Sequence, residues 1–174
     1  MLLLATLAAI ATIPPSSSAW TAYKPAVRQA VLAEHGPQVH IDSILIKGSY
    51  ALVHGTGFHE VLQRSGKSWK PMCDLTHTAP TVNALESRCR VPATIATQLA
   101  LEEPANLLAA RGQFTAAITA EQVAIASATG PQRENDRVRL QQLRILNQQM
   151  QLQQITREQA IRRWNQLQFS WALP

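Results

Sequence analysis

The stretch from Val39 to Asp74 reads VHIDSILIKGSYALVHGTGFHEVLQRSGKSWKPMCD. It contains two pairs of apolar segments, rich in β-branched and aromatic residues, which meet at Lys47-Gly48 and at Ser65-Gly66. A glycine in a two-residue connection supplies the positive φ that a tight hairpin turn needs. The stretch therefore predicts three or four consecutive antiparallel strands. Because so small a sheet cannot bury both faces alone, we expect the flanking helices to cover one of them.

Helical patterns flank this stretch on both sides. Apolar residues recur at helical spacing from Pro25 to Glu34, and beyond Asp74 the pattern changes to helix and stays there. Pro104 is expected to restart one of these helices, and Thr119 to Gln122 has the form of a capping box that opens another. The expected fold class is therefore α+β, a small antiparallel β-meander packed by helices and followed by a C-terminal helical hairpin.

The first residues, from Met1 to Ile13, are apolar and carry no charge, and small residues follow them. Ser17 and Ala19 stand at the −3 and −1 positions of a signal-peptidase site, which predicts a signal peptide over residues 1–19. The usual positive n-region is missing, so a start codon assigned too late and an uncleaved anchor are the alternatives. We expect a mature chain that begins at Trp20 and is periplasmic or secreted.

Cys73 and Cys89 are the only cysteines of the chain. An even number of cysteines in a chain expected to meet oxidising conditions predicts one disulfide bond between them. This bond would join the end of the last strand to the helix that follows it. The alternatives are a free thiol pair and a metal site.

The net charge of +5 is concentrated near the C-terminus. From residue 131 onward there are seven arginines, no lysine and three acidic residues, which leaves +4. Such a face can meet an acidic protein or an anionic membrane surface, although a solvated helix surface has the same composition. No nucleic-acid partner is expected, because aromatic and basic residues do not alternate along the strands. The shift in composition predicts an α+β domain over residues 20–130 and an Arg- and Gln-rich helical hairpin over residues 131–174.

Two helices are expected within this hairpin. The first, from Arg137 to Gln154, has two apolar stripes, and such a helix needs two neighbours. The second opens at a capping box, Thr156 to Gln159, and places Trp164 and Trp171 on one face. Tryptophan and arginine are enriched at the centres of protein interfaces. Packing within the hairpin and anchoring to a partner are both compatible with this face.

The hairpin resembles a known family in two segments, Leu140-Gln-Gln-Leu143-Arg-Ile-Leu146 and Ile155-Thr-Arg-Glu-Gln-Ala160. Both are similar to the short C-terminal helical hairpin called SHOCT, found at the ends of many bacterial proteins. The chain departs from that family in having Gln151 to Gln154 where a Gly-containing turn is usual. The resemblance implies a module for interaction or oligomerisation.

The earlier part of the chain carries a second resemblance. It is similar to small exported bacterial proteins of unknown function in Gly48 to Val53, Gly66 to Trp69, Cys73 and Arg90-Val91-Pro92. Some of those proteins are labelled as accessory to copper uptake. No ligand residues follow from this resemblance, because it rests on a strand pattern and a Val-Pro helix start.

The five histidines lie in one part of the chain, with Met72 and Cys73 beside them. Imidazole with thioether or thiolate ligands suits copper, and imidazole alone suits zinc. His54 and His59 stand at opposite ends of one Gly-rich bend, so the predicted meander brings them near enough to share an ion. The candidate ligands are these two histidines with Met72 and, as a further member, His77.

The sequence predicts no catalytic site. The segment His59-Glu60-Val61-Leu62-Gln63 has glutamine where a zinc protease has its second histidine, and it falls in a predicted strand. The segment Gly55-Thr56-Gly57 lacks the third glycine and the following helix of a phosphate-binding loop. The acidic residues are too scattered to indicate a pair of catalytic carboxylates.

The favoured interpretation is a non-catalytic exported accessory or structural protein without a cofactor. Its C-terminal hairpin would dock on a protein partner, or on a second copy of the chain, through Arg157, Arg162, Arg163, Trp164 and Trp171. The second interpretation is a periplasmic metal-handling protein that binds copper or zinc at the histidine cluster. Neither interpretation indicates a small-molecule substrate.

Overall fold

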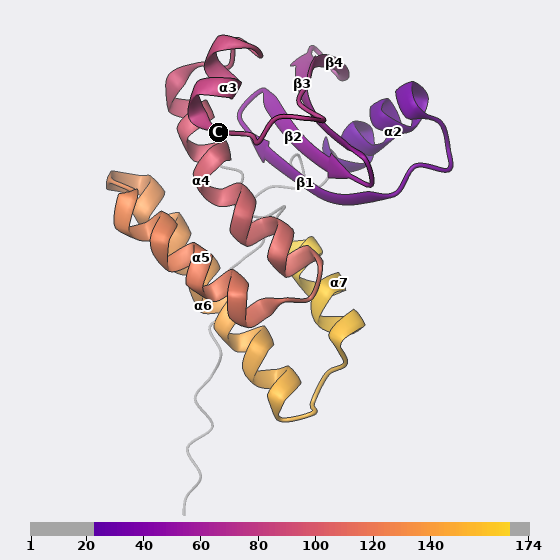
Figure 1. Ribbon diagram of the computed structural model, residues 1–174. Helices are drawn as coiled ribbons and strands as arrows, with labels where there is room; N and C mark the ends of the chain where they lie inside the picture. Colours follow the sequence, from indigo (N-terminus) through magenta and orange to yellow (C-terminus); the bar gives the residue numbers. More distant parts are fainter. Residues whose placement is uncertain (1–22, 168–174) are drawn as a thin grey trace, which may run out of the picture.

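The computed structural model describes residues 23–167 (Figure 1). The predicted signal peptide, residues 1–19, and Trp171 lie outside the described residues. Within them, one helix precedes four strands and five helices follow. In chain order the elements are α2 (Tyr23–His35), β1 (Ile41–Lys47), β2 (Tyr50–Gly55), β3 (Phe58–Ser65), β4 (Ser68–Asp74), α3 (Val82–Ser87), α4 (Ala93–Ala110), α5 (Phe114–Ser127), α6 (Gly130–Gln151) and α7 (Arg157–Leu167).

The four strands form one antiparallel sheet in the order β1-β2-β3-β4, a meander of consecutive hairpins. The turns from β1 to β2 and from β3 to β4 contain Gly48 and Gly66, whose φ angles are 56° and 62°. Residues with a side chain rarely adopt this conformation, so glycine closes both turns at little cost. The predicted small antiparallel meander within an α+β fold is confirmed.

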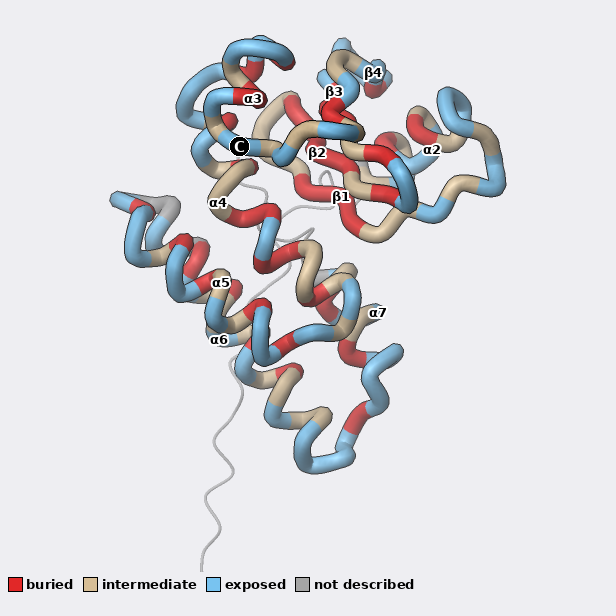
Figure 2. The backbone as a smooth tube through the Cα atoms, in the orientation of Figure 1, coloured by how far each residue is buried: buried red, intermediate tan, exposed pale blue. Residues whose placement is uncertain are grey.

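Helices cover both faces of this sheet (Figure 2). α2 packs Val27 and Val31 into a cluster with Ala51 on one face. On the other face, α3 and α4 pack against Leu52 and Val61. Ala51 and Leu52 are neighbours in β2, and successive strand residues point to opposite faces. The expectation of one covered face is wrong because both faces of the strands are apolar, and each therefore needs a helix.

α4 connects the sheet to the helical layer that Figure 1 shows below it. Ala96, near its start, belongs to a cluster on the sheet, and Ala109, near its end, belongs to a cluster among the helices. The helix runs unbroken through Pro104, so the predicted restart at this proline is wrong. A proline inside a helix removes one backbone hydrogen bond. The full burial of the apolar residues Leu99 and Ala105 on either side of it offsets that loss.

The first turn of α5 lies upstream of the predicted capping box. α5 begins at Phe114, whose ring is buried in the helical cluster, so packing determines where this helix starts. Thr119 lies inside the helix, and its hydroxyl donates to the Thr115 carbonyl at 3.4 Å.

The capping box predicted before α7 is confirmed. The Thr156 amide donates to Gln159 Oε1 at 2.8 Å, and the Gln159 amide donates to Thr156 Oγ1 at 3.2 Å.

α5, α6 and α7 enclose a third apolar cluster together with the end of α4. Its buried members are Ala109, Phe114, Ala117, Leu143, Leu146, Ile155, Ala160 and Trp164. The division predicted between residues 130 and 131 falls at the start of α6. Residues from both sides of that division share this cluster, so α6 and α7 pack as part of the helical layer.

A disulfide bond joins Cys73 of β4 to Cys89, just after α3, as the sequence predicts. Replacing both cysteines with alanine should lower the free energy of unfolding by about 3 kcal/mol, because the unfolded chain regains the entropy that the closed loop removes. Urea unfolding of the oxidised wild type and of the double variant measures the difference. Reductant should destabilise the wild type and leave the variant unchanged. Equal stability of the two proteins would contradict this expectation.

Candidate metal centre

His54 and His59 face each other across the bend that joins β2 to β3. They are direct partners in the register of these strands, and their ring centroids lie 3.7 Å apart. A Cβ atom at Gly55 would lie 1.9 Å from the Phe58 ring and 2.6 Å from the His40 carbonyl oxygen, so the bend requires glycine there. The Gly-rich bend therefore fixes the two imidazoles side by side on the face of the sheet that α4 covers.

Glu103 of α4 completes a group of three potential ligands. Its Oε1 atom lies 3.8 Å from His54 Nδ1 and 3.7 Å from His59 Nε2, and the three atoms all lie within 4.8 Å of one another. Each of the three atoms is buried without a hydrogen-bond partner among the described residues. Two ligands of a tetrahedral ion at about 2.1 Å lie about 3.4 Å apart. A small inward movement would therefore let all three atoms bind one ion.

Burial keeps both imidazoles neutral. Burial lowers the pKa of His54 to about 4, and the neighbouring His59 and the positive charge of Arg111 act in the same direction, although Asp42 opposes the shift. Burial and Arg111 also lower the pKa of His59. Burial raises the pKa of Glu103, and Arg111 acts against this rise. A metal binds the neutral imidazole, so at neutral pH neither histidine has to lose a net proton to the solvent before an ion can bind.

Two charged side chains, Asp42 and Arg111, lie beside the other ring nitrogen of His54, Nε2, and form a second layer around the three candidate ligands. Asp42 Oδ2 lies 3.7 Å from His54 Nε2 and 3.3 Å from Arg111 Nη2. Asp42 occupies an irregular position in β1, where the register shifts between Ile41 and Ser43. A carboxylate on the distal nitrogen of a ligating histidine is a common outer partner in metal sites.

The other predicted ligands lie elsewhere. Met72 is partly buried and packs against the cluster that α3 and α4 form with the sheet. His77 is exposed between β4 and α3 and does not join the converging group. Glu103 was missed by the sequence analysis, although Glu102 and Glu103 are the only charged residues of α4. Two adjacent acids in an otherwise uncharged helix could have indicated a polar site.

The residues predicted to bind a partner differ in their exposure. Trp164 has no exposed surface and packs in the third cluster, with its ring 5.6 Å from the guanidinium carbon of Arg139. A side chain so placed contributes to the core and cannot contact a partner while the fold is closed. Arg157 is exposed, and its Nη2 atom donates to the Arg111 carbonyl at 2.5 Å. Arg162 and Arg163 are also exposed.

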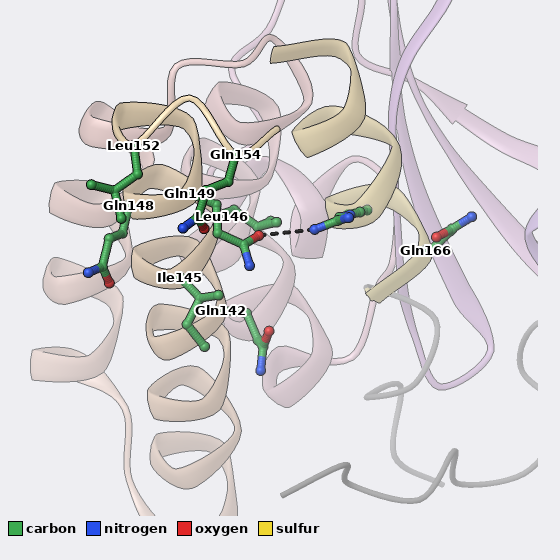
Figure 3. Close-up of a pocket in the computed structure, with 9 residues that line it drawn as sticks. Gln142, Ile145, Leu146, Gln148, Gln149, Leu152, Gln154 and Gln166 are labelled. Atoms are coloured by element: carbon green, nitrogen blue, oxygen red, sulfur yellow. Dashed lines mark hydrogen bonds between the residues drawn. The ribbon is translucent and has the colours of Figure 1, made fainter. Parts of the chain in front are cut away.

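A groove runs between α6 and α7 beside these arginines (Figure 3). Leu152 is exposed over 58% of its surface, and Arg163 donates to Gln149 Oε1 at 3.0 Å across the groove. The lining residues are Gln142, Ile145, Leu146, Gln148, Gln149, Leu152, Gln154, Arg163 and Gln166. Association through the hairpin stays a prediction, with this groove in place of Trp164 as its accessible surface.

Comparisons of this chain with protein-family models, with curated proteins and with solved structures found no match. The two resemblances noted in the sequence therefore stay predictions. Within residues 23–167, no helix combines the length and the apolar composition that crossing a membrane requires.

Proposed function

We propose that the protein is a metal-handling accessory protein that binds zinc(II) or copper(II) through His54, His59 and Glu103. The observation that carries this proposal is the convergence of three buried polar atoms that have no hydrogen-bond partner among the described residues. Two imidazoles and one carboxylate are donors that both ions accept. Copper(I) favours sulfur ligands, and both cysteines are bound in the disulfide.

Ordinary ion pairing does not account for this arrangement. The separations of 3.7 and 3.8 Å between Glu103 and the imidazole nitrogens exceed the range of a hydrogen bond. With a pKa of about 4, His54 carries no charge at neutral pH with which to pair. A buried polar group left without a partner costs about 1–3 kcal/mol. One divalent ion would bind all three atoms and remove these costs together.

The number of ligands favours transfer of the ion over a purely structural role. Structural zinc sites are closed by four protein ligands, whereas three leave a position for water or for a donor from another molecule. The side chains of His54 and His59 are each 17% exposed, so the group lies close to the surface. An ion held there could pass to a partner that supplies the fourth ligand. Transfer of this kind suits an accessory protein in an exported compartment.

Substitution of the ligands tests the proposal. Purified wild-type protein should bind one zinc ion, measured by competition with a chromophoric chelator. His59→Ala and Glu103→Gln should each weaken zinc binding by about 100-fold or more, since losing an outer-layer partner alone already costs about 10–100-fold. Zinc at a free concentration of 100 times its Kd should also raise the free energy of unfolding by about 2.7 kcal/mol.

His77→Ala is the matched control for these variants. His77 is exposed between β4 and α3, and it does not belong to the converging group. This variant should bind zinc with wild-type affinity. The proposal fails if the wild-type protein binds neither zinc nor copper. It also fails if His59→Ala and Glu103→Gln bind as tightly as the His77→Ala control.

A further inference from the structure

Arg111 follows the last residue of α4 and contacts both His54 and Asp42. Its Nη2 atom lies 3.1 Å from His54 Nε2 and 3.3 Å from Asp42 Oδ2. An arginine keeps its protons in proteins and has no acceptor atom, so it can only donate a hydrogen bond. His54 Nε2 must therefore accept from Arg111, which means that this nitrogen carries no proton.

The tautomer of His54 follows from this contact. A neutral imidazole has one N–H group, and when Nε2 accepts, the hydrogen is on Nδ1. Nδ1 is the atom that lies 3.8 Å from Glu103 Oε1 in the converging group. A ring nitrogen that carries hydrogen has no lone pair for a metal. With Arg111 in this position, one of the three ligand atoms is blocked.

We propose that Arg111 is an internal competitor of the metal ion and sets the affinity of the site. This inference rests on the proposed function and names how the same site is regulated. For an ion to bind His54 Nδ1, the hydrogen must move to Nε2, and Arg111 must then leave because two donors cannot face each other. Asp42 stays and accepts from Nε2–H, as outer carboxylates commonly do in metal sites.

The surroundings of Arg111 allow this exchange. Its side chain is 48% exposed, so the guanidinium can move into water without opening the core. Its backbone is held from α7, because Arg157 Nη2 donates to the Arg111 carbonyl at 2.5 Å. Gly112 makes room for this contact, since a Cβ atom there would lie 2.3 Å from Arg157 Nε. The side chain of Arg111 can therefore swing while its position at the end of α4 stays fixed.

Zinc affinity tests this role directly. Arg111→Met keeps the length of the aliphatic stem and removes the donor and the charge, and we expect its Kd for zinc to be about tenfold lower than that of the wild type. Arg137→Met removes the same charge from a 61% exposed side chain of α6 and serves as the control. Its Kd should equal that of the wild type. A gain shared by both variants would overturn the role of Arg111, because net charge alone would then explain it.

The tautomer of His54 gives a second, independent readout. A two-bond ¹H–¹⁵N correlation spectrum of the imidazoles distinguishes Nδ1–H from Nε2–H. We expect Nδ1–H in the metal-free wild type, Nε2–H in the zinc complex, and a shift toward Nε2–H in metal-free Arg111→Met. Nε2–H in the metal-free wild type would overturn the inference.

The two proposals fail in different ways. If the wild type binds zinc and Arg111→Met binds it equally or less tightly, only the role of Arg111 is overturned. If neither protein binds zinc or copper, the proposed function is overturned as well. If only Arg111→Met binds, the competitor role is supported and the proposed function of the wild-type chain is overturned.

Discussion

Replacing Arg139 with methionine should lower the free energy of unfolding by about 3–5 kcal/mol. Arg139 is 4% exposed and lies among α4, α5 and α6. Its Nε and Nη2 atoms donate to the two oxygens of Glu121 at 2.9 and 3.1 Å, and its Nη1 atom donates to Glu102 at 2.5 Å. The variant would leave two fully buried carboxylates close together, although Lys47 would still pair with Glu102. Removing one partner of a buried ion pair costs far more than the pair contributes.

The pKa values of the neighbouring acids support this expectation. Burial raises the pKa of Glu121, with Arg139 opposing the rise. Burial and the charges of Glu102 and Glu121 raise the pKa of Asp136 to about 6. The acids in this network thus already take up protons more readily than exposed carboxyl groups do. Loss of Arg139 would increase their mutual repulsion.

Urea unfolding at pH 7 measures the effect of Arg139→Met. Arg137→Met is a suitable control, because Arg137 lies two positions away, is 61% exposed and pairs with Glu134 at 3.4 Å across one helical turn. Exposed pairs of this kind contribute about 0.3–0.5 kcal/mol. Adding Glu121→Gln to Arg139→Met should restore part of the lost stability. A loss below about 1 kcal/mol, within the range of one ordinary hydrogen bond, would contradict the structural role given to Arg139.

Replacing Trp164 with alanine should also cost about 3–5 kcal/mol, the range for deleting a buried aromatic side chain. Trp164 is fully buried among Phe114, Leu143 and the other members of the third cluster. Its ring also lies 5.6 Å from the Arg139 guanidinium carbon, so the variant removes a cation–π contact in addition to apolar packing. The cavity left behind cannot close fully, because its walls belong to four different helices.

Leu152→Ala is the matched control for Trp164→Ala. Leu152 lies in the same hairpin, immediately after α6, and 58% of its surface is exposed. This substitution should change the free energy of unfolding by less than about 0.5 kcal/mol. Thermal and urea unfolding followed by far-ultraviolet circular dichroism compare the two variants. If Trp164→Ala were as stable as the wild type, the ring would not be part of the core. Trp164 would then again be a candidate residue for contacting a partner.

The sheet could be predicted because its signals are local. Gly48 and Gly66 each stand in a two-residue connection, and their positive φ angles are what such turns require. The same holds for the capping box of Thr156 and Gln159, in which both partners lie within one helical turn. Signals of this kind depend on the chain within a few residues, so the sequence alone contains them.

The candidate site could be predicted only in part. The sequence predicts that His54 and His59 pair because one short bend joins them, and the register confirms that they face each other. Glu103 and Asp42 come from a distant helix and from an irregular position in the edge strand β1. No local pattern indicates which face of α4 meets the sheet. Met72 and His77 are near the two histidines in sequence, but nearness in sequence does not determine where a side chain points, and neither residue joins the converging group.

Tertiary packing decides the remaining differences. The capping pattern at Thr119 is a valid local signal, but burial of Phe114 extends the helix upstream of it. Trp164 has the residue type and spacing of an interface anchor, and the same properties fit a core position. The choice depends on whether α4 and α5 lie against the hairpin, and that contact joins parts of the chain far apart in sequence.

The disulfide between Cys73 and Cys89 spans a connection that proteases are able to reach. His77 and Ala79 are exposed between β4 and α3, and exposed loops are preferred sites of cleavage. A cut at this point would divide the chain into a fragment that contains the sheet and a fragment that contains the helices from α3 onward. The bond would keep the two fragments covalently attached, and the cluster around Leu52, Leu85 and Leu99 would still hold them together. A nicked molecule would thus stay together as a two-chain protein with all of its candidate ligands in one particle.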